Sequence, residues 1–212
     1  MQLFARDVPE LPFPGDADAL QVLWCPLDHE PYFQPHPIVR WRRAETVGNP
    51  LVDAPAPDSD SDASYLPTAC VLSPERVQEY PAGWELPADL AKRIWAWEDE
   101  SPNSDGWSYF SHLSSAPGSK VGGWVSWIQD PAHVECGEGH EMAHLLTIAT
   151  QEFDIESGKR WAPLEERALL APRAPLELQE PTGLMIQDAG SLYLFVCLEC
   201  PERPVDSLSQ GS

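Results

Sequence analysis

The sequence predicts an α+β protein that is mainly β, made of two unequal but related lobes of coiled antiparallel sheet with few short helices. Three observations support this fold class. Twenty-three prolines among 212 residues favour short segments and turns over long helices. Nine tryptophans supply bulky anchors of the kind that strands carry. Similar apolar runs, each ending in cysteine, occur near both ends of the chain.

The first elements are short strands. Met1 to Arg6 and Ala19 to Cys25 are apolar enough for strands, and the proline-rich residues 7–19 read as the loop that joins them. Ile38 to Arg42 alternates apolar and charged side chains, which is typical of a strand with one exposed face. We therefore expect a small N-terminal sheet.

The middle of the chain contains the best helix, between two acidic, proline-containing loops, residues 53–64 and 98–106. Residues 53–64 consist of Asp, Ser, Ala and Pro and cannot bury a core, which predicts an acidic loop. Leu86 to Trp97 predicts a helix, because Pro87 suits its first turn and Leu90, Ile94 and Trp97 share one face.

The strongest strand signal is the run from Gly190 to Cys197. Aromatic and branched side chains fill it without a polar face, which is typical of a strand buried on both sides. Cys200 follows Cys197 with CxxC spacing, which lets two sulfur atoms bind one metal ion.

The two ends of the chain resemble each other. Leu20 to Cys25 aligns with Leu192 to Cys197 without a gap, and Met1 to Arg6 aligns with Leu145 to Thr150. Each copy reads as strand, connection and strand ending in cysteine, so we interpret the pair as a degenerate internal duplication. This interpretation predicts a single domain with a shortened N-terminal lobe and a larger C-terminal lobe, at about residues 1–50 and 65–205 of 1–212.

The charge is strongly acidic. Thirty-four Asp and Glu against 13 Lys and Arg give a formal net charge of -21. Such a field repels nucleic acid and anionic lipid and attracts basic partners. No apolar stretch approaches the roughly 20 residues that cross a bilayer, and the first residues lack a secretion signal. We expect a cytoplasmic protein without nucleic-acid or membrane partners, in which the five cysteines are free or metal-bound.

One segment supports two hypotheses about metal binding. The run from His140 to His144 matches HExxH, the zinc-peptidase signature in which two histidines one helical turn apart bind zinc. Glu141 would then be the general base of catalysis. A third ligand could come from one of two glutamates further along the chain, Glu165 or Glu166.

The competing hypothesis treats the same segment as a turn followed by a strand. Cys136 and His140 then form a CxxxH pair that can meet Cys197 and Cys200. The result is a closed Cys3His zinc site, which is structural because it leaves no open position for water. Two further histidines are reserve ligands, His133 and His144. A chain without metal, in which the cysteines are small core residues, is the third possibility.

Four phrases of the sequence carry a resemblance to a known family: Leu20 to Pro26, Lys120 to Trp127, Met142 to Ile148 and Asp188 to Cys197. In this order they resemble the YwqG-like family of domains of unknown function, in its actinobacterial form. They are also distantly similar to programmed cell death protein 2 and its yeast relative. Those relatives usually carry two cysteines in the turn where this chain has only Cys136.

The resemblance implies a β-rich protein-binding scaffold without known catalysis. The eukaryotic relatives hold a basic ribosomal protein, and YwqG-like genes tend to lie near toxin systems. We therefore expect a non-catalytic module that holds or neutralises a basic partner, a toxin or a ribosomal protein, as an immunity factor or dedicated chaperone. Trp41, Trp124 and Trp127 are candidate anchors at its interface. The alternative function is a zinc-dependent metallopeptidase that uses HExxH.

Overall fold

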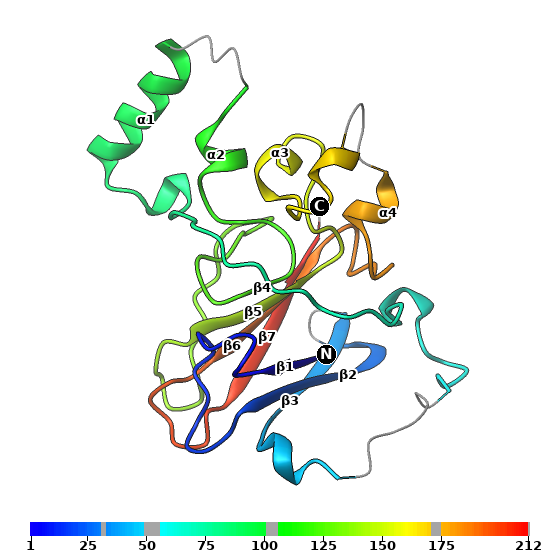
Figure 1. Cartoon of the computed structure of the whole chain (residues 1–212). Coiled ribbons are helices and arrows are strands. Elements are labelled where there is room, and N and C mark those ends of the chain that lie inside the picture. The colour runs from blue at the N-terminus through cyan, green and yellow to red at the C-terminus, as the bar shows by residue number, and fades with distance from the viewer. Residues whose placement is uncertain (31–32, 49–55, 101–105, 171–174, 212) are drawn as a thin grey trace.

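A computed structural model describes residues 1–30, 33–48, 56–100, 106–170 and 175–211. Two antiparallel sheets form its centre (Figure 1). The first sheet has the order β1 (Gln2–Phe4), β2 (Ala19–His29), β3 (Gln34–Arg42). The second has the order β4 (Lys120–Val121), β5 (Ala143–Ala149), β6 (Ser191–Val196), β7 (Val205–Gln210).

Helices are few and mostly short. They are α1 (Ala88–Glu100), α2 (Tyr109–His112), α3 (Gly158–Trp161) and α4 (Leu176–Gln179). Single 3-10 turns occur at Ala44–Thr46, Ala63–Tyr65, Gly83–Glu85 and Arg167–Leu169. The predicted α+β, mainly β fold is confirmed. In the described parts of the chain, no helix is long and apolar enough to cross a membrane.

The two sheets share one apolar core. Leu20 and Val22 from β2 lie in the same cluster as Leu192 and Leu194 from β6. Every residue of β6 is buried, and its alternate side chains, including Tyr193, belong to a second cluster on the other face of the sheet. Leucine side chains buried to this degree contribute about 1.5–3 kcal/mol each. The prediction of a strand buried on both faces is confirmed.

The sheets repeat one arrangement of three strands, β1-β2-β3 and β5-β6-β7. Leu3 pairs with Leu20 in the first sheet, and Ile148 pairs with Leu192 in the second. Leu3 therefore corresponds to Ile148, one residue beyond the Thr147 that sequence comparison gave. The side chains of Leu3 and Ile148 both face the shared core. Thr147 cannot be the equivalent of Leu3, because neighbouring residues of a strand point to opposite faces of the sheet. Strand β7 also extends the second sheet beyond the predicted lobe boundary near residue 205.

The predicted helix is present as α1, two residues later than expected at its start. Pro87 directly precedes it, as its fixed φ suggests. Figure 1 shows α1 projecting away from both sheets. Ile94 is only half-buried, and Trp95 and Trp97 are 55% and 43% exposed. Trp97 therefore does not form the buried face that the helical spacing predicted.

Candidate metal centre

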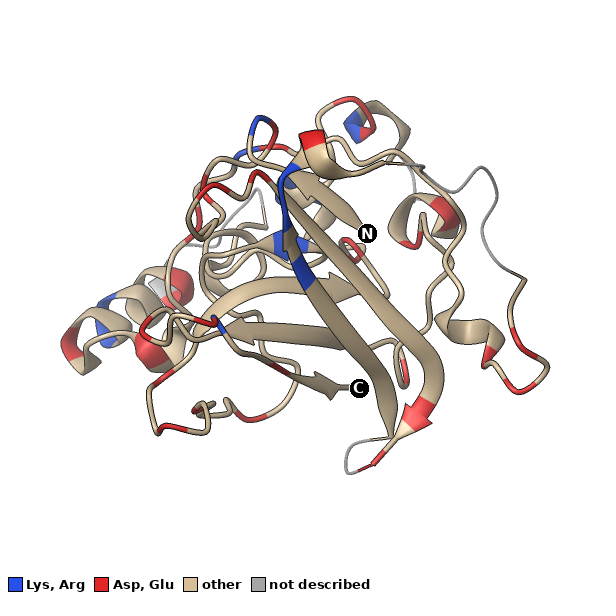
Figure 2. Ribbon diagram, turned by 90° about the horizontal axis from the view of Figure 1, so that it is seen from below, with Lys and Arg blue, Asp and Glu red and all other residues tan. Residues whose placement is uncertain are grey.

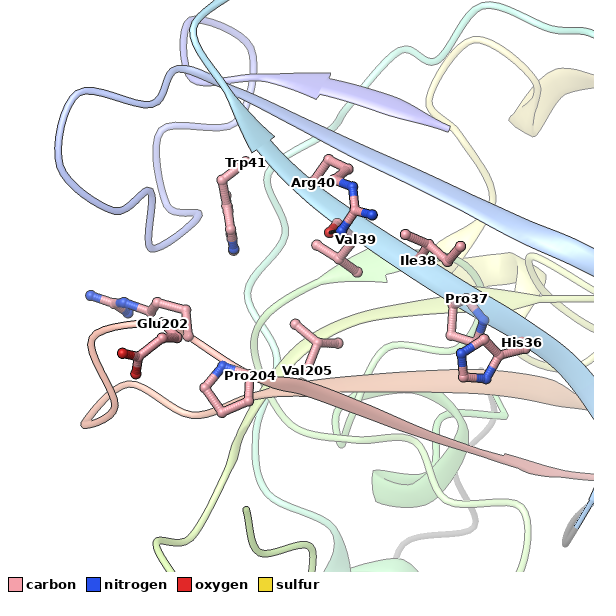
Figure 3. A pocket seen from close by; sticks show the side chains of 10 residues that line it. His36, Pro37, Ile38, Val39, Arg40, Trp41, Glu202, Pro204 and Val205 are labelled. Atoms are coloured by element: carbon pink, nitrogen blue, oxygen red, sulfur yellow. Dashed lines mark hydrogen bonds between the residues drawn. The ribbon is translucent and has the colours of Figure 1, made fainter. Parts of the chain in front are cut away.

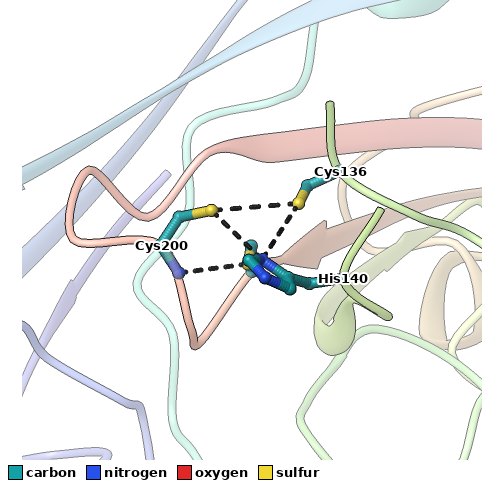
Figure 4. A group of neighbouring side chains, drawn as sticks. Cys136, His140 and Cys200 are labelled. Carbon is teal, nitrogen blue, oxygen red and sulfur yellow. Dashed lines mark hydrogen bonds between the residues drawn. The ribbon is translucent and has the colours of Figure 1, made fainter. Parts of the chain in front are cut away.

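Two turns of the second sheet bring four sulfur and nitrogen ligands together (Figure 4). Cys136 and His140 belong to a turn before β5, in which the Cys136 N–H donates to the His140 carbonyl at 3.0 Å. Gly139 takes φ +77° in this turn, a conformation that favours glycine. Cys197 and Cys200 belong to the turn after β6. Antiparallel pairing of β5 with β6 places the two turns at the same end of the sheet.

The distances fit a tetrahedral site. Zinc bonds of about 2.3 Å to sulfur and about 2.0 Å to nitrogen would separate two sulfurs by about 3.8 Å, and sulfur from nitrogen by about 3.5 Å. The sulfurs of Cys136 and Cys200 are 3.9 Å apart. The sulfurs of Cys136, Cys197 and Cys200 lie 3.6, 3.7 and 3.4 Å from His140 Nδ1. These four side chains form a cluster that can bind a metal ion.

Local hydrogen bonds shift the pKa values of two of the thiols in opposite directions. The Cys200 N–H donates to Cys197 Sγ at 3.3 Å, and this bond lowers the pKa of the Cys197 thiol. The hydrogen bond with Cys197, followed by burial, raises the pKa of Cys200 to about 12. A cation at the centre would favour ionisation of both thiols. His140 Nε2 lies 3.9 Å from a Glu199 carboxylate oxygen, an acceptor type that often orients metal-bound histidines.

The HExxH residues do not form a helix. His140 lies in the turn, while His144 lies in β5, because this segment pairs with β6. His144 Nδ1 lies 3.0 Å from the Gly122 carbonyl oxygen, and its Nε2 lies 2.9 Å from Thr147 Oγ1. Burial, followed by the nearby Lys120 charge, lowers the pKa of His144 to about 4. The helical geometry on which the peptidase hypothesis depends is therefore not formed.

The other suggested ligands lie elsewhere. Glu141 has an 80% exposed side chain, and His133 lies 3.0 Å from a Glu135 carboxylate oxygen. In the part of the chain that the structure describes, the metal-type cluster includes none of the remaining candidates: His133, His144, Glu165 and Glu166.

The three candidate anchor tryptophans have different environments. Trp127 packs against Tyr193 and Phe195, with ring centroids 5.1 and 6.0 Å apart, so its partly buried ring lies against the core. Trp124 is 42% exposed, and Trp41 is half-buried. Sequence reasoning overlooked more exposed tryptophans, which lie on and just before α1: Trp84 and Trp95.

Sequence reasoning also missed Glu79, a carboxylate at the centre of a buried polar network. It accepts hydrogen bonds from the N–H groups of Ala116 and Trp124, both at 2.6 Å, and from Lys120 Nζ at 2.8 Å. Lys120 also donates to the Trp124 carbonyl. Burial lowers the pKa of Lys120, and the Glu79 charge opposes this shift. At Gly123, with φ +70°, a Cβ would lie 1.9 Å from Glu79 Oε1. The turn at Gly123 therefore leaves space for the Glu79 carboxylate only because residue 123 has no side chain.

The fold and the cluster define an α+β protein in which two turns of the larger sheet bring together three buried cysteines and a partly exposed histidine that can bind a metal ion. No family model, curated protein or solved structure matches this chain. The resemblance to the YwqG-like family stays a prediction from the sequence.

Proposed function

We propose that this protein is a non-catalytic binding module that holds a basic protein partner and is stabilised by a structural zinc ion. The observation that carries the proposal is the excess of acidic over basic residues, 34 against 13. Most carboxylates consequently have no basic residue to neutralise them. Figure 2 shows acidic residues on α1 and on several loops around the sheets. Such a surface would attract a basic protein and gain from neutralisation on binding.

The Cys3His cluster supports a structural role for zinc. Four protein ligands complete a tetrahedron, so no position remains for the water that a hydrolytic zinc site activates. The ion would instead join the turn before β5 to the turn after β6. The functional class, immunity factor or dedicated chaperone, follows from the sequence resemblance and depends on the identity of the partner.

Affinity purification of the tagged protein from its own host tests the binding function. At low salt we expect one basic protein in stoichiometric amount, identified by mass spectrometry. Washes of increasing salt should release it, because the screening length falls from about 10 Å at 0.1 M to about 3 Å at 1 M. Recovery of no basic protein, or retention unchanged at 1 M salt, would contradict the proposal.

Metal analysis of the purified chain tests the zinc role separately. We expect about one zinc per chain in the parent protein and in Cys70→Ser, since Cys70 is exposed and lies outside the cluster. Cys200→Ser should lose most of the zinc and melt at a lower temperature. Glu141→Gln should keep both zinc and partner, whereas loss of a zinc-dependent peptidase activity in this variant would support the alternative function.

A further inference from the structure

A groove of about 440 Å³ lies between the outer strands of the two sheets (Figure 3). Residues 36–41 of β3 form one wall, and residues 202–205, which lead into β7, form the other. Each of these strands is the last in its sheet. Gln34 Nε2 donates to the Ser207 carbonyl at 3.3 Å and brings the strands together beyond one end of the groove. The edge of β3 that faces the groove has no partner strand in its sheet. Pro35 and Pro37 have no N–H to donate, so another strand would pair with the backbone beyond Pro37.

Arginine side chains gather at this groove although the molecule as a whole is acidic. Arg40 and Arg203 line it, and Arg42 lies on the same exposed face of β3 as Arg40. Figure 2 shows this concentration of basic residues towards one end of a long strand. Within the described ranges, none of the three arginines forms an ion pair, whereas three others do: Arg6, Arg43 and Arg76. Unneutralised guanidinium groups favour a carboxylate ligand.

Trp41 provides a second, independent indication of a ligand. Its ring projects from β3 towards the turn that carries Glu202 and Pro204 (Figure 3). The indole Nε1 is buried, and no acceptor for it occurs among the residues that the structure describes. A buried N–H group without an acceptor is unfavourable, and a carbonyl oxygen of a ligand in the groove would satisfy it.

Backbone hydrogen bonds connect the groove wall opposite β3, residues 202–205, to two cysteines of the candidate metal centre. The Arg203 N–H donates to the Cys200 carbonyl, and the Cys197 N–H donates to the Pro204 carbonyl, both at 3.0 Å. Arg203 has φ +50°, a left-handed conformation that a residue with a side chain adopts only when its surroundings impose it. These hydrogen bonds hold the backbone of Arg203 beside the groove.

We propose that the groove binds an extended acidic peptide segment of a partner protein, which adds as a strand to β3. Apolar side chains of the peptide would pack on Val39 and Val205, and the alternating acidic side chains would pair with Arg40 and Arg203. A peptide carbonyl would accept the Trp41 N–H. About six residues, or about 20 Å, match the wall of β3 formed by residues 36–41. This site is separate from the acidic surface proposed for a basic partner.

Fluorescence anisotropy with the purified full-length chain tests the proposal. The probe is a labelled Glu-Val-Glu-Val-Glu-Val-Glu peptide, and the same peptide with Lys for Glu should not bind at the groove. Arg40→Glu and Arg203→Glu should each weaken binding at least tenfold. Arg93→Glu on α1 is the matched control, because it makes the same charge change on an exposed helix, and it should alter affinity less than twofold.

Two results of this experiment would overturn the proposal. Equal weakening by Arg93→Glu and Arg40→Glu would show that net charge, and not the groove, attracts the peptide. Displacement of the peptide by an equal concentration of glutarate would show that the arginines bind any small dicarboxylate.

A nuclear magnetic resonance titration observes the groove directly. With ¹⁵N-labelled tryptophan, the Trp41 indole signal is the one absent from Trp41→Phe. In the parent protein this signal should move downfield on addition of the unlabelled acidic peptide, because the N–H gains an acceptor. An unmoved Trp41 signal at saturating peptide would refute binding in the groove, whatever the anisotropy shows.

Discussion

The ion pair between Glu79 and Lys120 should make Glu79→Gln strongly destabilising. The two side chains are each 12% exposed, with Lys120 Nζ 2.8 Å from Glu79 Oε2. The same carboxylate also accepts two backbone N–H groups, which a glutamine side chain with one oxygen cannot all satisfy. Removing one partner of a buried pair costs about 3–5 kcal/mol. At about 2–4 °C per kcal/mol for a domain of this size, the melting temperature should fall by roughly 6–20 °C.

Glu10→Gln is the matched control for this prediction. Glu10 pairs with Arg76 on the surface, where the two side chains are 53% and 78% exposed, so its loss should change stability little. Urea unfolding at pH 7 measures both variants. Glu79→Gln combined with Lys120→Met should lose less stability than the sum of the single changes, because the double variant no longer buries an unpaired ammonium. Equal losses in Glu79→Gln and Glu10→Gln would refute the reasoning.

Other perturbations probe the glycine turn, the buried histidine and the metal centre. Gly123→Ala should destabilise by about 1–3 kcal/mol more than Gly122→Ala in thermal melts, because only the first methyl group would meet Glu79. His144 has a folded pKa of about 4, below the unfolded value near 6.5, so stability should rise from pH 4 to 6.5 by up to about 3 kcal/mol. Urea unfolding across this range should show a smaller rise in His144→Gln. A zinc chelator should lower the melting temperature of the parent protein by roughly 10 °C but leave Cys200→Ser unchanged.

Local composition was sufficient for the elements with the clearest patterns. The unbroken apolar run of β6 and the Pro87 start of α1 were both recognised from the sequence. Strand β3 was recognised only from Ile38, although it begins at Gln34, because Pro35 and Pro37 read as non-strand residues. An edge strand tolerates proline, since one side of its backbone has no partner strand. The exposure of α1 could not be predicted, because helical spacing shows which side chains share a face but not whether another element packs on that face.

The site was predictable where it depends on short spacing and strand pairing. CxxxH and CxxC identified the four side chains, and the structure shows that pairing of β5 with β6 brings them together. The buried Glu79 was missed because a single glutamate in an irregular segment has no periodic pattern. The groove between β3 and β7 was missed for a different reason. Its two walls come from opposite ends of the sequence, and no local sequence pattern shows how far apart they lie in the fold.

The central position of β6 has a consequence for folding during synthesis. Strand β5 is complete about forty residues before β6 emerges, and β7 comes later still. At about 5–20 residues per second, a ribosome needs roughly 2–8 s to make the intervening chain. During this interval Leu146 and Ile148 lack the strand that covers them, and an unpaired edge of β5 is open to other nascent chains. Synthesis of β6 is therefore the step that closes this edge of β5.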